Sequence, residues 1–134
     1  MAAGTIRRVL CAALATLLAS CSSGPVRSVQ TTVQGLFQPK AEQQLAAGLK
    51  LYEDGKYPES ARSLQAALDQ GLAAADQVKA RKHLAFMHCI AGRGAQCRDE
   101  FRKALEVDPG LELTPAEAGH PGWGPVFRSV KSRR

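Results

Sequence analysis

The sequence predicts an all-α fold of two helix hairpins closed by a C-terminal capping helix, preceded by a signal peptide and a flexible tether. Aromatic residues make up only 5% of the 134 residues, whereas alanine and leucine abound, which favours helices packed through small side chains. A pattern of small, apolar and glycine positions recurs after 37 residues, so that Gly55 is followed by Gly92. These glycines and Pro109 stand where helical periods end.

The first twenty residues have the three-part plan of an export signal. Arg7 and Arg8 form a basic start, and the apolar run 9–18 that follows is too short for a stable membrane span. Small residues come next. We therefore expect residues 1–20 to be a signal peptide that is removed from the mature chain.

The end of this segment is similar to the bacterial lipobox, a leucine and two small residues before a cysteine, here Leu18-Ala19-Ser20-Cys21. A thiol is the nucleophile that takes the diacylglyceryl group, and small neighbours let the signal peptidase reach the backbone. The resemblance implies that Cys21 is acylated, and each buried methylene would add about 0.8 kcal/mol of membrane affinity. Ser22 replaces the aspartate of inner-membrane retention, which implies the outer membrane with the chain facing the periplasm. The alternative is an ordinary signal peptide that contains a cysteine.

Residues 21–40 are rich in serine, threonine, glutamine, valine, glycine and proline, and they show no helical period. Such a composition is typical of a flexible tether. Residues 41–75 and 76–109 then each read as helix, turn and helix. The helices are expected at 41–53, 57–70, 77–91 and 96–107.

The spacing of these hairpins resembles the tetratricopeptide (TPR) repeat, in which a small residue on the first helix faces small residues on the second. In the first copy Gly48 has this role, facing Ser60 and Ala67. The equivalent residues of the second copy are Ala85, Cys97 and Ala104. Leu72 departs from the pattern, because the family has a proline at the end of a repeat.

Two repeats are fewer than a helical solenoid usually needs, so the open end requires a cap. We assign residues 110–134 to a cap and a basic tail. Thr114-Pro115-Ala116-Glu117 has the residues of a capping box, and Trp123 and Phe127 are expected to pack on the second hairpin. The basic end is expected to be a frayed tail, or else a contact for an anionic partner, and consists of Arg128, Lys131, Arg133 and Arg134.

Two cysteines, Cys89 and Cys97, remain after Cys11 and Cys21 are assigned to the signal and the lipid. They stand in the last turn of one predicted helix and the first turn of the next, which favours a structural disulfide. Separate buried thiols are the first alternative. A metal or redox site that uses the nearby His83 or the adjacent histidine, His88, is the second.

The sequence carries no nucleophile elbow, phosphate loop or His-Glu-x-x-His pattern, so we expect no enzyme activity, no metal and no cofactor other than the lipid on Cys21. The carboxylate pairs Glu53-Asp54 and Asp99-Glu100 are expected to be solvated helix caps. Nucleic acid is not expected as a partner, because the +6 formal charge is not interleaved with aromatic residues.

A longer tract resembles TssQ-like TPR lipoproteins, a small family associated with type VI secretion gene clusters of proteobacteria. The matching segments are His88-Cys89, Cys97 to Leu105, Asp108-Pro109, Leu113 to Pro121 and Trp123 to Phe127. The resemblance implies a protein–protein interaction scaffold or accessory, whose partner is a secretion-machine component in the cell envelope. The alternative is a pilotin-like or assembly-factor lipoprotein of another envelope complex. An enzyme or enzyme activator acting on peptidoglycan would need a polar cleft, which the sequence does not indicate.

By analogy with TPR proteins, the partner would bind a concave face made by the first helix of each repeat. The residues expected there are Leu45, Leu49, Tyr52, Lys82 and Phe86. The alternative is that Leu49 and Phe86 pack under the cap, which would remove them from a groove.

Overall fold

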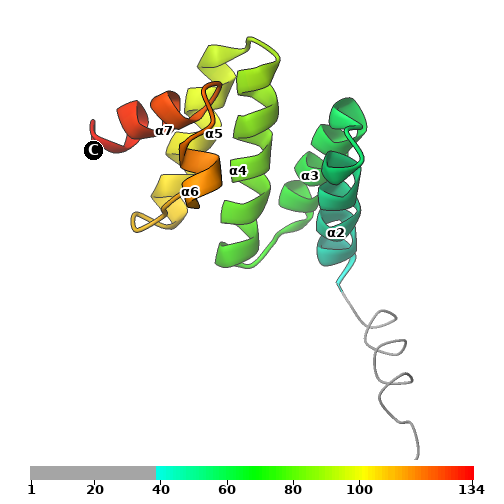
Figure 1. The fold of residues 1–134 in the computed structure, drawn as a ribbon. Coiled ribbons are helices and arrows are strands. Elements are labelled where there is room, and N and C mark those ends of the chain that lie inside the picture. Colours follow the sequence, from blue (N-terminus) through cyan, green and yellow to red (C-terminus); the bar gives the residue numbers. More distant parts are fainter. Residues whose placement is uncertain (1–38) are drawn as a thin grey trace, which may run out of the picture. The chain divides into compact units, whose positions relative to one another are not determined.

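The computed structural model describes residues 39–134, and these residues form helices without any strand (Figure 1). The all-α prediction is therefore confirmed. In chain order the helices are α2 (Lys40–Glu53), α3 (Tyr57–Gln70), α4 (Ala74–Ile90), α5 (Gly94–Val107), α6 (Pro115–Ala118) and α7 (Gly124–Lys131). The first two helices pair as one hairpin and the next two as a second, while α6 and α7 form the cap.

The expected signal peptide (1–20), the acylation site Cys21 and the tether up to residue 38 lie outside the described residues. The last residue assigned to the tether, Lys40, is instead the first residue of α2. Residues 38–134 form one compact unit. No helix between residues 39 and 134 combines the length and the apolar character that a membrane crossing requires.

Both hairpin turns are built in the same way. Gly55 has a φ of 74° and Gly92 a φ of 72°, which is the left-handed conformation that glycine adopts without steric cost. The next backbone N–H in each turn returns 2.8 Å to a carbonyl of the preceding helix, from Lys56 to Leu51 and from Arg93 to His88. The predicted turns are therefore confirmed as glycine-terminated helix ends that the 37-residue repeat places equivalently.

The second hairpin begins earlier than the periodicity indicated, because α4 starts at Ala74 and α5 starts at Gly94. The linker before α4 explains the first difference. Leu72 is buried, so the linker is held against the first hairpin. The Gln77 side-chain amide also donates a 2.8 Å hydrogen bond to the Leu72 carbonyl. This anchoring leaves only residues 71–73 outside the helices.

The first hairpin closes tightly around Gly48, as the sequence predicts. The Ser60 hydroxyl donates a buried 2.8 Å hydrogen bond to the Gly48 carbonyl. A Cβ added at Gly48 would lie 2.7 Å from Cδ2 of Leu64. The space in front of this glycine is therefore filled by a large side chain of α3. In the second hairpin the equivalent small residues, Ala85, Cys97 and Ala104, are fully buried.

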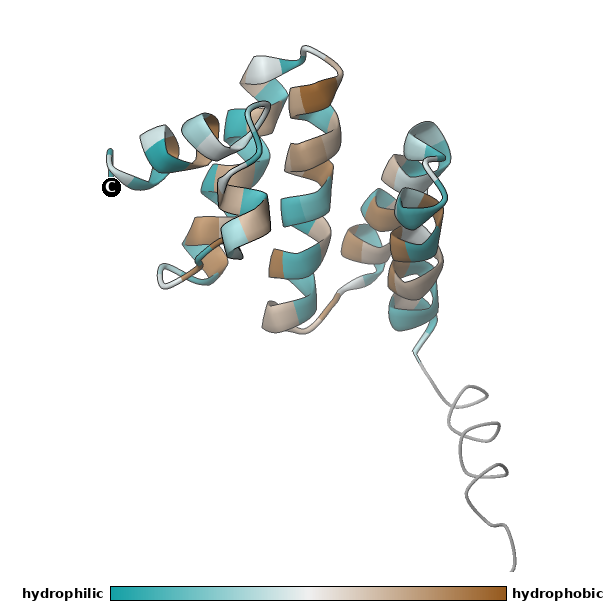
Figure 2. Ribbon diagram, in the orientation of Figure 1, coloured by the Kyte–Doolittle hydropathy of each residue, from teal (hydrophilic) through white to brown (hydrophobic). Residues whose placement is uncertain are grey.

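Helix α4 supplies side chains to two hydrophobic cores, and it carries both brown and teal residues in Figure 2. Leu84 and Met87 pack with Leu64 in the core shared with the first hairpin. Phe86 points into the other core, which α4 shares with α5 and the cap. Because two of its faces are covered, α4 links the first hairpin to the rest of the domain.

The cap packs Trp123 and Phe127 on the second hairpin, as predicted. Trp123 stacks on Phe86 with ring centroids 4.3 Å apart, and Phe127 meets Phe101 at 5.2 Å. The Thr114 capping box is also present. The expected single capping helix is, however, two short helices. Its interruption includes Pro121, which lacks the N–H that a continuous helix would use.

Three of the four basic side chains at the C-terminal end are bound to the domain, so the expectation of a frayed tail is wrong for them. The Arg128 guanidinium donates to the Ala118 carbonyl at 3.1 Å, and the Lys131 ammonium donates to the Leu111 carbonyl at 2.9 Å. Arg134 donates to the carbonyl of Leu105. These bonds satisfy carbonyl groups at the ends of helices and loops, so the positive side chains hold the cap in place.

Candidate functional site

The five residues expected to line a concave groove do not form an open surface. Leu45 is 5% exposed and Phe86 is 2% exposed, and Phe86 lies beneath the Trp123 ring. Lys82 forms a 2.7 Å ion pair with Glu117 of α6. The expectation of a partner groove is therefore corrected for these residues: Leu45 packs in the core that the first hairpin shares with α4, whereas the cap covers Phe86 and Lys82. The alternative interpretation, in which Phe86 packs under the cap, is confirmed.

The remaining two groove residues, Leu49 and Tyr52, are partly buried against the first core. Tyr52 meets the edge of His83 with ring centroids 5.0 Å apart. Burial is the main cause that lowers the pKa of His83, although its Nδ1 lies 2.8 Å from the Lys79 carbonyl oxygen. His83 is therefore a packed, neutral histidine at neutral pH.

One carboxylate of the two expected solvated pairs is buried. Glu100 is 8% exposed and accepts 3.1 Å hydrogen bonds from Arg81 and Lys103. A hydrogen bond from Lys103 is the main cause that lowers the pKa of Asp99. The prediction of a solvated pair is thus wrong for Glu100. It pairs with one cation from α4 and one from α5, so its charge links the two helices and is not a free acid.

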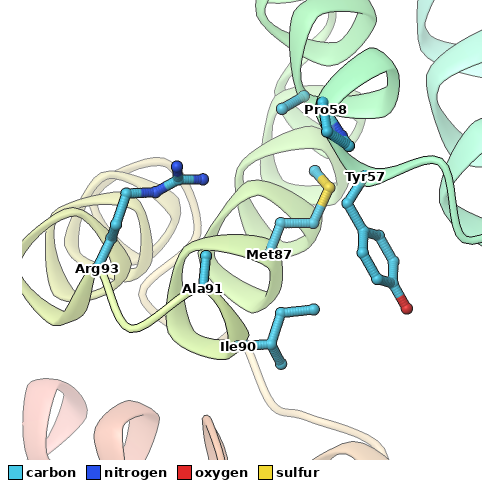
Figure 3. A pocket seen from close by; sticks show the side chains of 7 residues that line it. Tyr57, Pro58, Met87, Ile90, Ala91 and Arg93 are labelled. Carbon is cyan, nitrogen blue, oxygen red and sulfur yellow. The ribbon is translucent and has the colours of Figure 1, made fainter.

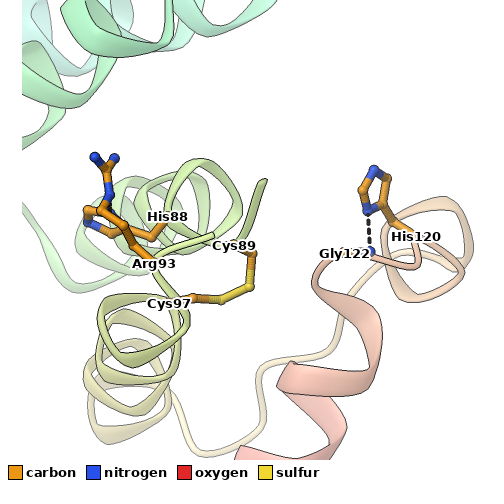
Figure 4. The surroundings of a disulfide bond; sticks show 6 residues. All are labelled: His88, Cys89, Arg93, Cys97, His120 and Gly122. Atoms are coloured by element: carbon orange, nitrogen blue, oxygen red, sulfur yellow. Dashed lines mark hydrogen bonds between the residues drawn. A yellow bond between two sulfur atoms is a disulfide. The ribbon is translucent and has the colours of Figure 1, made fainter. Parts of the chain in front are cut away.

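Cys89 and Cys97 are joined as a disulfide across the α4–α5 turn, with Cα atoms 5.1 Å apart (Figure 4). This separation lies within the range that a disulfide spans without backbone movement. The bond closes a short loop that contains Ile90, Ala91 and Arg93. In residues 39–134 no cluster of three or more His, Cys, Asp or Glu side chains is arranged to hold a metal ion.

An apolar hollow lies between the two hairpins, beside both glycine turns. We call it the notch, and its volume is about 560 Å³, within the range of ligand sites. Its walls come from the start of α3 and from the end of α4 with the turn that follows (Figure 3). The lining residues are Tyr57, Pro58, Ala61, Met87, Ile90, Ala91 and Arg93.

The notch gathers the large apolar side chains that the domain leaves in solvent. Tyr57 is 40% exposed and Ile90 is 43% exposed, and they are the two most exposed large hydrophobic side chains among residues 39–134. Met87 closes the floor and is 2% exposed. An exposed apolar patch with a rigid floor is a typical feature of a protein-binding surface.

Sequence reasoning missed the notch, although each residue carried a weak signal. Tyr57 directly follows the first turn, and Ile90 directly precedes the second. Both hairpins place their turns at the same end, so these side chains converge although they are 33 positions apart (90 − 57). An apolar residue beside a glycine turn in each of two repeats could have indicated such a surface.

Comparison with known protein families, with curated proteins and with solved structures finds no match to this chain.

Proposed function

We propose that the chain is an acylated lipoprotein that acts at the periplasmic side of the outer membrane as a protein–protein interaction scaffold. In this proposal it is an accessory of a type VI secretion system. The compartment rests on the resemblance of residues 18–21 to a lipobox, and the machine rests on the TssQ-like tract. The disulfide between Cys89 and Cys97 supports an exported chain, because disulfides persist in oxidising compartments.

The notch is the observation that carries the proposed scaffold role. It places two half-exposed apolar side chains, Tyr57 and Ile90, between hairpins whose backbones are fixed by glycine turns. A partner that covers these side chains gains roughly 25 cal/mol for each square ångström of apolar surface removed from water. Because the wall is already ordered, little of this gain is offset by the entropy of ordering it.

Photo-crosslinking in the cells that produce the protein tests this proposal. A photoreactive phenylalanine analogue at Ile90 of the full chain should capture a membrane component of the contractile secretion machine. Gln65 is the matched control, because it is an exposed residue of α3 outside the notch. The analogue at Gln65 should give no such product. A Cys21→Ser change should abolish the product from position 90, because the chain then loses its lipid.

Three results would contradict the proposal. Equal amounts of crosslinked product from positions 65 and 90 would show that the notch is not the binding surface. A product that persists after Cys21→Ser would show that the interaction does not need the lipid anchor. Capture of only an outer-membrane pore from position 90 would support a pilotin-like or assembly-factor role instead.

A further inference from the structure

The notch contains one charge, and that charge lacks an acidic partner. Six of its seven lining residues are aliphatic, aromatic or proline, and the seventh is Arg93. Within residues 39–134 no carboxylate lies in ion-pair distance of Arg93, whereas Lys50 and Lys82 each have one and Lys103 has two. A cation beside an apolar surface is complementary to a ligand that carries an apolar group next to an anion.

The Arg93 guanidinium is oriented by its neighbour. Its Nε donates a 3.0 Å hydrogen bond to Nδ1 of His88. Desolvation is the main cause that lowers the pKa of His88, and the adjacent Arg93 charge lowers it further. A neutral imidazole can accept this bond, so the terminal nitrogens of the guanidinium are left for a ligand. Their planar fork matches a carboxylate.

The wall that carries Arg93 is also fixed in position. The backbone N–H of Arg93 donates to the His88 carbonyl at 2.8 Å, and that of Gly92 donates to the Cys89 carbonyl at 3.1 Å. The Cys89–Cys97 disulfide closes the same loop. The backbone that carries Arg93 is therefore fixed beside the apolar floor before any ligand arrives.

From these observations we propose that the notch binds a segment of a partner protein in which an aliphatic or aromatic side chain stands beside a carboxylate. The apolar side chain lies between Tyr57 and Ile90, above Met87. The carboxylate, from Asp, Glu or a chain end, pairs with Arg93. This inference deepens the proposed scaffold function and rests on it for the identity of the partner as a protein.

A displayed library of random peptides, selected on immobilised residues 22–134, tests the ligand chemistry directly. This fragment contains the whole compact unit of residues 38–134. The enriched peptides should carry an apolar residue next to Asp, Glu or a free C-terminus. Selection on an Ile90→Asp variant should lose these sequences, because the variant places a charge in the apolar wall.

The strongest enriched peptide is then resynthesised, and its affinity is measured by fluorescence anisotropy. Arg93→Ala should weaken binding about tenfold or more, since it removes a charge-assisted hydrogen bond. Arg93→Lys should weaken binding less, because the charge remains. Arg98→Ala is the matched control and should leave affinity unchanged, because Arg98 is exposed and lies outside the notch. Circular dichroism verifies that each variant is folded.

Three results would overturn the inference. The first is enrichment of apolar peptides without acidic residues, and the second is an equal loss of affinity from Arg93→Ala and Arg98→Ala. The third is selection of the same peptides on the Ile90→Asp variant. Concentration-dependent dimers that Ile90→Asp abolishes in sedimentation would show that a second copy covers the notch. The two proposals can fail separately. Selection of acidic–apolar peptides, without a crosslink from position 90 in cells, would contradict only the proposed cellular function. A crosslink from position 90, without selection of such peptides, would contradict only the proposed ligand chemistry.

Discussion

Replacing Gly48 with alanine should destabilise the domain, although alanine is the better helix former. A Cβ at this position would lie 2.7 Å from Cδ2, 2.8 Å from Cγ and 3.2 Å from the backbone nitrogen of Leu64. Carbon atoms in favourable contact are about 3.5–4.0 Å apart, so α2 and α3 must separate. Such overpacking typically costs about 1–3 kcal/mol.

Two further contributions set the net effect. Separation of the helices weakens the 2.8 Å hydrogen bond from Ser60 to the Gly48 carbonyl, which contributes about 1 kcal/mol. Helix propensity acts in the opposite direction, because alanine stabilises a helix by about 1 kcal/mol relative to glycine. We therefore expect Gly48→Ala to lower the free energy of unfolding by about 1–3 kcal/mol, measured by urea unfolding of residues 22–134 with circular dichroism.

Gly94→Ala is the matched control, because a Cβ there meets only the flexible end of Arg98 at 3.4 Å. This control should change stability by less than about 0.5 kcal/mol. In a double-mutant cycle, Leu64→Ala should reduce the cost of Gly48→Ala, because the clashing side chain is gone. The reasoning fails if Gly48→Ala equals or exceeds wild type in stability, or if its cost is the same with and without the Leu64 side chain.

Three other predictions follow from the same structure. The Cys89–Cys97 bond spans a sequence separation of 8, so loop entropy predicts that a double alanine variant loses about 2.5 kcal/mol in urea unfolding. A reductant should destabilise the wild-type protein by the same amount and leave the double alanine variant unchanged. A wild-type urea midpoint that does not move on reduction would contradict this. Trp123→Ala should cost about 3–5 kcal/mol in thermal unfolding. Trp123→Phe should cost much less, because the buried indole N–H has no partner within residues 39–134; equal costs would refute this. Burial lowers the pKa values of His83 and His88 below their usual 6.5, so the unfolded chain binds more protons just below that pH. The free energy of unfolding should therefore be highest above pH 6.5 and fall as the pH drops below it. A variant with glutamine at both His83 and His88 should show a smaller decline in its urea midpoint, and an unchanged decline would refute the assignment.

Local sequence signals predicted much of the fold. Gly55 and Gly92 end their helices as expected, because only a residue without a side chain adopts positive φ at low cost. The Thr114 capping box was also predictable, since its partners lie within one helical turn. The disulfide pairing followed from two cysteines beside a short turn. In each case the determining contacts join residues close together in the chain.

The candidate site was much less accessible to sequence reasoning. TPR analogy left open whether Phe86 lines a groove or packs under the cap, and the structure places it beneath Trp123. Periodicity indicates which face of a helix is apolar, and it does not say whether another element of the chain or a partner covers that face. Glu100 was misjudged for the same reason, because its cations come from both α4 and α5.

The sequence alone thus predicted the two helix hairpins, their turns and the small residues that allow the first hairpin to close, and it favoured the disulfide across the second turn. Only the tertiary structure decided that the cap fills the face expected to bind a partner and that Tyr57 and Ile90 meet at the notch. The physical reason is one of range. Turn and helix preferences arise from neighbouring residues, whereas burial and surface shape depend on how distant elements pack, which no single period in the sequence encodes.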